Sequence, residues 1–134
     1  MARSTVTNQN IYSDFRTDFD LHPVTGDLAR LTDEEAVKRS LKNILYTDVY
    51  ERPWKPTMGS GLKKLLFEPI TMVTQTLIKK AIEETIQNYE PRIRTYEVYV
   101  TALPDQNAFS VTSIFMIINS QEPAKFSLLL NRIK

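Results

Sequence analysis

The sequence predicts an α+β fold: an N-terminal arm and two main helices packed on a C-terminal three-stranded antiparallel meander. Residues 33–47 and 70–89 carry apolar side chains at three- and four-residue steps, which is the helical period. After Pro91 the period changes to two, as in strands, and two turn-like segments divide the remainder into three runs. Helices followed by strands favour helices gathered on one face of a small sheet.

Composition limits the classes of function. The chain has 134 residues, 17 basic and 16 acidic side chains, a net charge of +1, one histidine and no cysteine. One domain over residues 11–134 is the simplest organisation, after a flexible polar segment at residues 1–10. The near-neutral charge argues against nucleic acid as a partner. No apolar run approaches the roughly 20 residues that cross a bilayer, so we expect no membrane partner.

The N-terminal elements are an arm and a first helix. Residues 11–22 alternate loosely and predict an extended arm or short strand, followed by a turn at Pro23 and Gly26. Thr32 and Glu35 match a capping box, with threonine at the cap of the helix. The arm's apolar anchors are Phe15, Phe19 and Leu21, and the basic helix face, read as solvated, carries Lys38, Arg39 and Lys42.

The next elements are a short helix and a long one. GLKKLLFEP predicts a short helix that ends at Pro69, and Pro69 would open the first turn of the helix at 70–89. In the short helix Leu62, Leu65 and Leu66 face inward, and Lys63 and Lys64 face outward. The long helix should bury Ile70, Val73, Leu77, Ile78, Ala81, Ile82, Ile86 and Tyr89.

The three strands follow. The first alternates from Tyr96 to Ala102, and the second covers residues 109–118. The phase of the second slips near Thr112 and Ser113, which predicts a bulge or burial on both faces. Phe126, Leu128 and Leu130 lie on the last strand.

Enzyme motifs are weak in this sequence. GSGLKK lacks the GxxxxGK[ST] pattern of a phosphate-binding loop, and His22 in a turn-like HPVTGD is read as structural. A glycoside hydrolase needs two paired carboxylates, but none of the acidic side chains lies in an identifiable apolar pocket. The acids considered are Asp14, Asp18, Asp20, Glu51, Glu68 and Glu90. We assign no catalytic, cofactor-binding or metal-binding residue and expect no cofactor.

Two sites remain open on physical grounds. With extended backbone at Pro91, Glu90 and Arg92 point to the same side, so they form either a surface ion pair or a planar fork for a partner. The last strand, residues 126–132, is apolar and close to the terminus. Either a helix or the N-terminal arm covers its edge, or the edge accepts a strand from a partner.

The segments FDLHPVTGDLARLTDEEAVKRSLKNILYT, ERPWKPTMGSGLKKLLFEP and NYEPRI resemble the baseplate wedge and sheath-initiator family of contractile-tailed phages, which is related to a type VI secretion baseplate subunit. The resemblance covers about residues 11–134. It implies a structural protein of the virion tail baseplate, made in the host cytoplasm. It also implies other wedge proteins, the tail sheath subunit and the tail tube as partners.

The resemblance further implies roles for the two open sites. Glu90, Pro91 and Arg92 would pack into a core helical bundle of wedge proteins, and the last strand would template sheath assembly by strand addition through Phe126, Leu128, Leu130 and Arg132. The family also carries a lysozyme-like label, so a tail-associated peptidoglycan hydrolase is the alternative function.

The family context gives the proline- and glycine-rich segment a role as a structural connector that holds the first helix against the long one. Its residues are Arg52, Pro53, Pro56, Gly59 and Gly61. The glycines would let neighbouring wedge chains come close. Valine at Gly59 and Gly61 would then block assembly and leave the isolated fold largely intact.

Overall fold

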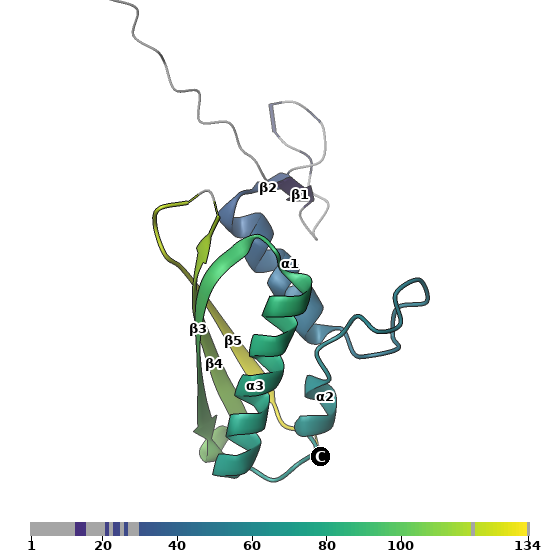
Figure 1. Ribbon diagram of the computed structural model, residues 1–134, viewed down its shortest axis with the longest axis vertical. Helices are drawn as coiled ribbons and strands as arrows, with labels where there is room; N and C mark the ends of the chain where they lie inside the picture. Colours follow the sequence, from purple (N-terminus) through teal and green to yellow (C-terminus); the bar gives the residue numbers. More distant parts are fainter. Residues whose placement is uncertain are drawn as a thin grey trace, which may run out of the picture. The chain divides into compact units, whose positions relative to one another are not determined.

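The computed structural model describes residues 13–15, 21, 23–24, 26, 30–118 and 120–133 (Figure 1). The chain divides into two compact units, residues 1–37 and 38–134, and each is described by itself. The predictions for residues 1–10, Phe19 and His22 lie outside the described residues. The single domain over residues 11–134 stays a prediction.

In the first unit, β1 (Ser13–Phe15) pairs antiparallel with β2 (Arg30–Thr32), with Asp14 opposite Leu31. Helix α1 (Glu34–Tyr46) begins here, one residue from its predicted start. The predicted cap at Thr32 is wrong, because the helix begins at Glu34 and Asp33 occupies the cap position. Asp33 adopts a left-handed backbone (φ 49) before the helix, and its carbonyl accepts the hydrogen bond of Val37 N at 3.0 Å.

The second unit contains the rest of α1, the short helix α2 (Leu62–Leu65) and the long helix α3 (Met72–Tyr89). Leu41, Ile44 and Leu45 of α1 are buried. In and beside α2, Leu62 and Leu66 are buried, and both lysines are exposed as predicted.

Helix α3 starts later than predicted and buries a different stripe. The predicted place of Pro69 in the first turn is wrong, because the helix begins at Met72 and Thr71 is its cap. The Thr71 side chain accepts the Thr74 N–H at 3.2 Å. Val73 and Leu77, predicted inside, are exposed. Two threonines join the buried stripe because their hydroxyls are satisfied: Thr74 Oγ1 donates to the Pro69 carbonyl, and Thr85 Oγ1 to the Ala81 carbonyl. The buried residues of α3 are Thr74, Ile78, Ile82, Thr85 and Ile86.

The predicted antiparallel meander is confirmed, in the order β3 (Ile93–Leu103), β4 (Ala108–Ile117) and β5 (Ala124–Asn131). A short 3₁₀ turn at Pro104–Gln106 joins the first two strands. Helix α3 packs against β3, across one face of the sheet (Figure 1). Together the helices and meander give the α+β fold that the sequence predicts.

The predicted bulge at Thr112 and Ser113 is wrong. Both residues keep regular register with β3 and β5, and the register shift lies at Ile93/Thr95 instead. Ser113 occupies an inward position between Val111 and Phe115. A polar residue at a core position breaks the apolar alternation in sequence without breaking the strand.

Candidate partner-binding surfaces

The first candidate surface is the corner at which α3 becomes β3. Glu90 ends the helix, with its N–H bonded to the Ile86 carbonyl. Arg92 Nε donates to Glu90 Oε1 at 2.6 Å, and a terminal nitrogen of Arg92 donates to Oε2 at 2.9 Å. The Glu90 side chain is 1% exposed and that of Arg92 is 24% exposed. The predicted same-side placement is confirmed, and the pair is a two-point fork over a buried carboxylate rather than a surface ion pair.

The second candidate surface is the outer edge of β5. Within the described residues, β5 pairs with β4 alone. Three of the predicted binding residues, Phe126, Leu128 and Leu130, are buried and contribute to the core. Arg132 is held by the fold, because its N–H donates to the Asn107 carbonyl and its Nε donates to the Glu68 carbonyl at 3.0 Å. A partner strand would therefore meet the main chain of β5 and its exposed side chains, which are Lys125, Ser127, Leu129 and Asn131.

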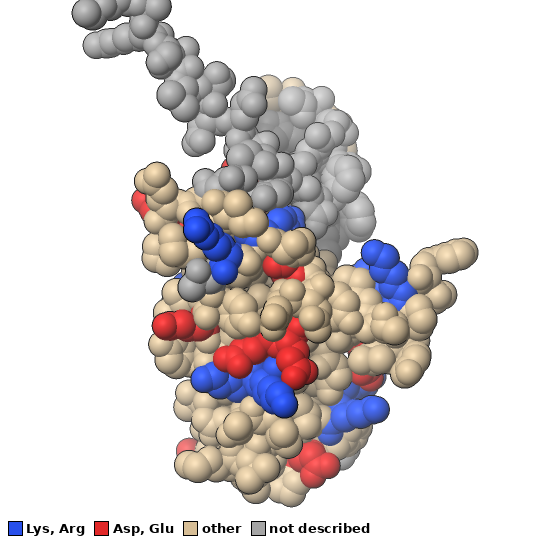
Figure 2. Space-filling model, in the orientation of Figure 1, with Lys and Arg blue, Asp and Glu red and all other residues tan. Residues whose placement is uncertain are grey.

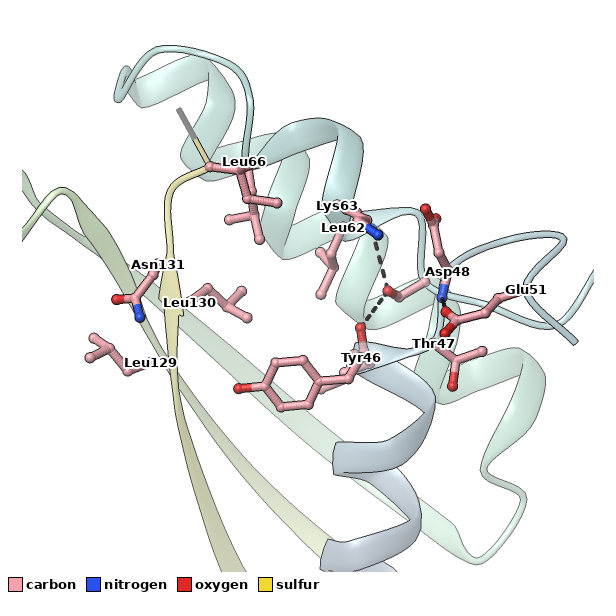
Figure 3. Close-up of a pocket in the computed structure, with 13 residues that line it drawn as sticks. Tyr46, Thr47, Asp48, Glu51, Leu62, Lys63, Leu66, Leu129, Leu130 and Asn131 are labelled. Carbon is pink, nitrogen blue, oxygen red and sulfur yellow. Dashed lines mark hydrogen bonds between the residues drawn. The ribbon is translucent and has the colours of Figure 1, made fainter.

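A pocket of about 300 Å³ lies beside the end of this edge (Figure 3). Leu62, Leu66 and Leu130 point toward one another across it. Asp48, Lys63 and Asn131 are polar lining residues. Sequence reasoning missed this pocket, because its walls come from α1, α2 and β5, which are distant along the chain.

The third candidate surface is the connector between α1 and α2, which hydrogen bonds fix at its base. Ser60 Oγ donates to the Leu45 carbonyl of α1 at 2.7 Å, and the Tyr89 hydroxyl of α3 donates to the Thr57 carbonyl at 2.6 Å. Within the loop, Tyr50 N donates to the Pro56 carbonyl at 2.7 Å. These contacts join the loop to α1 and α3, and the role as a structural connector stays a prediction.

The two glycines of the connector differ. A Cβ on Gly59 would lie 2.6 Å from backbone atoms of Asp48 and Val49, so the close approach there is by the protein's own chain. A Cβ on Gly61 would meet nothing within 4 Å, but φ is +64. A cavity of about 220 Å³ adjoins both residues. The expectation that valine at both positions leaves the fold intact is wrong, since Gly59 has no room for a side chain.

The remaining charged groups form no enzyme-like cluster in the described part of the chain. Glu51 Oε2 accepts the Asp48 N–H at 2.7 Å, and Glu90 is bound by Arg92. No group of three or more His, Cys, Asp or Glu residues there could hold a metal ion. No described helix is long and apolar enough to cross a membrane. The face in Figure 2 carries blue and red atoms interspersed. Helix α3 also holds two ion pairs with four-residue spacing, Lys79–Glu83 and Lys80–Glu84, each at 3.9 Å.

One ionisable group on the sheet has a shifted pKa. The Tyr99 hydroxyl donates to Glu97 Oε2 at 2.7 Å. This hydrogen bond and the negative charge of Glu97 raise the pKa of Tyr99 above its usual value. Both side chains are exposed, on the sheet face that carries Leu129.

The sequence of this chain matches a protein-family model and a characterised phage protein. Residues 31–120 match the family model of baseplate wedge protein gp25. The chain is 32% identical over 96 residues to baseplate wedge protein gp25 of Enterobacteria phage T4, which covers 72% of this chain and 73% of that protein.

Solved structures with the same fold include one isolated protein and chains of two baseplate complexes. A protein of Geobacter sulfurreducens named as a tail lysozyme has a TM-score of 0.69 at 22% identity, over 75% of this chain and 92% of that one. A chain of the anti-feeding prophage baseplate has a TM-score of 0.56 at 20% identity, over 92% and 87%. A chain of the type VI secretion baseplate complex has a TM-score of 0.58 at 14% identity, over 73% and 97%. At these identities the likeness establishes the fold. The family-model match and the identity to the phage T4 protein establish more: the chain belongs to the baseplate wedge protein gp25 family.

Proposed function

We propose that this chain is a structural subunit of the baseplate wedge of a contractile tail, located in the virion, and that it templates the first ring of the tail sheath. It is made in the host cytoplasm and contacts other wedge proteins, the sheath subunit and the tail tube. The observation that carries the proposal is the outer edge of β5, which no other strand of the described residues pairs with, in a chain of this family.

The Glu90–Pro91–Arg92 corner is the proposed contact with the core helical bundle of the wedge. The two-point fork fixes the guanidinium plane, and Arg92 keeps 24% of its side chain exposed for a partner. A main-chain hydrogen bond also restrains the corner, because Ile118 N donates to the Arg92 carbonyl at 3.0 Å. A partner helix would meet a preorganised surface, which lowers the entropic cost of binding.

The β5 edge is the proposed sheath contact. An added strand gains main-chain hydrogen bonds along the edge, and side-chain pockets supply specificity. The 300 Å³ pocket at the end of β5 could receive an apolar side chain of that strand, since leucines form much of its wall. The templating strand is thus the one that the sequence predicts. A partner strand would bind the main chain of β5, however, and not the leucine side chains that are buried in the core.

Peptidoglycan hydrolysis is the weaker alternative. A retaining glycosidase needs two carboxyl groups about 5 Å apart and an inverting one needs about 6.5–9.5 Å. Glu90 offers no free carboxylate, because both of its oxygens accept hydrogen bonds from Arg92. The family's structural role therefore agrees better with the site than acid–base catalysis does.

The test is cosedimentation with the sheath subunit encoded in the same genome, using Leu129→Lys on the edge strand. A lysine on an edge strand opposes strand addition. Thr101→Lys is the matched control, because Thr101, Ser110 and Leu129 lie in one register row and Thr101 is on the opposite edge strand. A chain ending at Pro123 is a poorer test, since it removes four buried core residues.

We expect wild type and Thr101→Lys to seed sheath polymer and Leu129→Lys to lose most of this activity. Equal seeding by all three would remove the templating role of β5. Wedge binding by Arg92→Ala, measured by pull-down, tests the corner separately. Lysis of purified peptidoglycan that Glu90→Gln abolishes would instead establish the hydrolase.

A further inference from the structure

Trp54 is the most exposed large apolar side chain among the described residues. It is 95% exposed, and it lies near the middle of a run of eight consecutive exposed residues, 50–57. This loop extends away from α1 and α2, at the right of Figure 1. Tryptophan is highly buried on average in folded proteins. The sequence drew attention to this residue as the only tryptophan, but neither the corner nor the β5 edge uses it.

The loop presents Trp54 on a constrained backbone. The Tyr50 N–H bonds to the Pro56 carbonyl across its base, and Met58 N bonds to the Lys55 carbonyl at 3.0 Å. Pro53 and Pro56 restrict the backbone on both sides of Trp54. Tyr50 itself holds φ at +70, which is strained for a bulky side chain. The positive φ and the hydrogen bonds of this loop hold the indole in solvent, so they do not contribute to burial of the core. A preorganised aromatic side chain loses less entropy when it binds a partner.

Charge around Trp54 indicates the chemistry of the partner. Arg52 and Lys55 flank Trp54, and both are exposed. In the described part of the chain, neither side chain has a carboxylate partner, and the Arg52 guanidinium donates a hydrogen bond to the Met58 sulfur at 3.9 Å. Blue atoms are visible on the protruding loop in Figure 2. Tryptophan and arginine are the side chains most enriched at interface hot spots.

We propose that residues 50–57 form an anchor that inserts the Trp54 indole into an apolar pocket with a carboxylate rim on a neighbouring wedge protein. The proposal rests on the proposed wedge function and adds a third contact, separate from the corner and the β5 edge. A protein pocket fits the loop better than a lipid surface does, because one indole on a rigid turn with two cations gives little apolar area for insertion.

The single tryptophan allows a direct test. The chain is produced with 5-hydroxytryptophan in place of Trp54, so that its fluorescence is excited selectively in the presence of other proteins. The probe is the wedge subcomplex from the same genome, purified without this chain, and acrylamide quenching measures access to the indole. Vesicles that contain anionic phospholipid form a second arm. Affinities are compared for wild type, Trp54→Ala, Arg52→Glu with Lys55→Glu, and Tyr99→Ala as a control at another exposed aromatic residue.

We expect binding to the subcomplex to protect the indole from acrylamide. Trp54→Ala should weaken binding about 30-fold, as for a hot-spot anchor, and the charge-reversal variant should also bind weakly and respond less to salt. Equal affinity of wild type and Trp54→Ala, with an accessible indole, would overturn the anchor but leave the wedge role intact. Protection by vesicles alone would overturn it in favour of a membrane contact. Failure of wild type to bind the subcomplex would refute the wedge role and the anchor together.

Discussion

Replacing Arg92 with alanine leaves the Glu90 carboxylate buried without its partner. That side chain is 1% exposed, and both of its oxygens lose a hydrogen bond from the guanidinium. Removing one member of a buried pair costs about 3–5 kcal/mol. Because the Arg92 side chain is 24% exposed, water screens part of the interaction, and we expect a loss of about 2–3 kcal/mol in the free energy of unfolding.

The assay is urea unfolding followed by far-ultraviolet circular dichroism, since the one tryptophan is already exposed in the folded state. At this chain length the loss corresponds to a fall of about 8 °C in Tm. Arg92→Lys keeps the charge but not the planar fork, so its loss should be intermediate. Glu90→Gln removes the buried charge and should cost less than Arg92→Ala. In the double variant the two losses should not add.

A loss below about 0.5 kcal/mol for Arg92→Ala would refute this reasoning. That value is typical of a surface substitution away from any special feature. It would mean that Glu90 is solvated without Arg92 and that the corner is an ordinary helix end.

Three further predictions follow from packing and charge. Gly59→Val should cost at least about 2 kcal/mol in urea unfolding, and more than Gly61→Val, because only Gly59 faces backbone at 2.6 Å. Ser113→Ala should stabilise the protein by about 1 kcal/mol in the same assay, because the buried Ser113 Oγ has no hydrogen-bond partner among the described residues. Glu97→Gln should lower the pKa of Tyr99 toward its usual value of about 10 in ultraviolet absorbance titration. In wild type the raised pKa of Tyr99 makes a small favourable contribution to the free energy of unfolding below about pH 10. This contribution is lost as the pH rises through the pKa of the folded state.

The sequence was sufficient for the order of the elements because each has one dominant period. The helical period and the alternation of two do not overlap, so α3 and the three strands were predicted in place. The exact buried stripe was harder to predict. Val73 and Leu77 are exposed and Thr74 and Thr85 are buried, because a threonine hydroxyl bonded to its own helix is cheap to bury. Hydrophobicity alone ranks these four residues in the opposite order.

Only some features of the candidate surfaces could be predicted from sequence, because some depend on neighbouring residues and others on the whole fold. Glu90 and Arg92 are close in sequence and Pro91 restricts the backbone between them, so their same-side placement could be predicted from three residues. The burial of the Glu90 carboxylate could not. On β5 the apolar side chains that drew attention are buried in the core. The proposed binding groups there are main-chain atoms, which no residue type reveals. The exposure of Trp54 depends on where residues 50–57 project, which is a property of the fold.

Helix α3 connects the three candidate surfaces. Its C-terminal end carries Glu90, its Tyr89 hydroxyl bonds to Thr57 at the base of the Trp54 loop, and its Gln75 side chain bonds to the Val100 carbonyl of β3. The corner, the anchor loop and the meander are thus attached to one helix by direct contacts. A subunit that joins several proteins needs its binding surfaces held at set positions relative to one another, whereas a hydrolase needs one enclosed pair of carboxylates. The use of α3 as a common support therefore favours the wedge role, and loss of the Tyr89 hydroxyl in Tyr89→Phe should loosen the loop without affecting the Glu90–Arg92 pair.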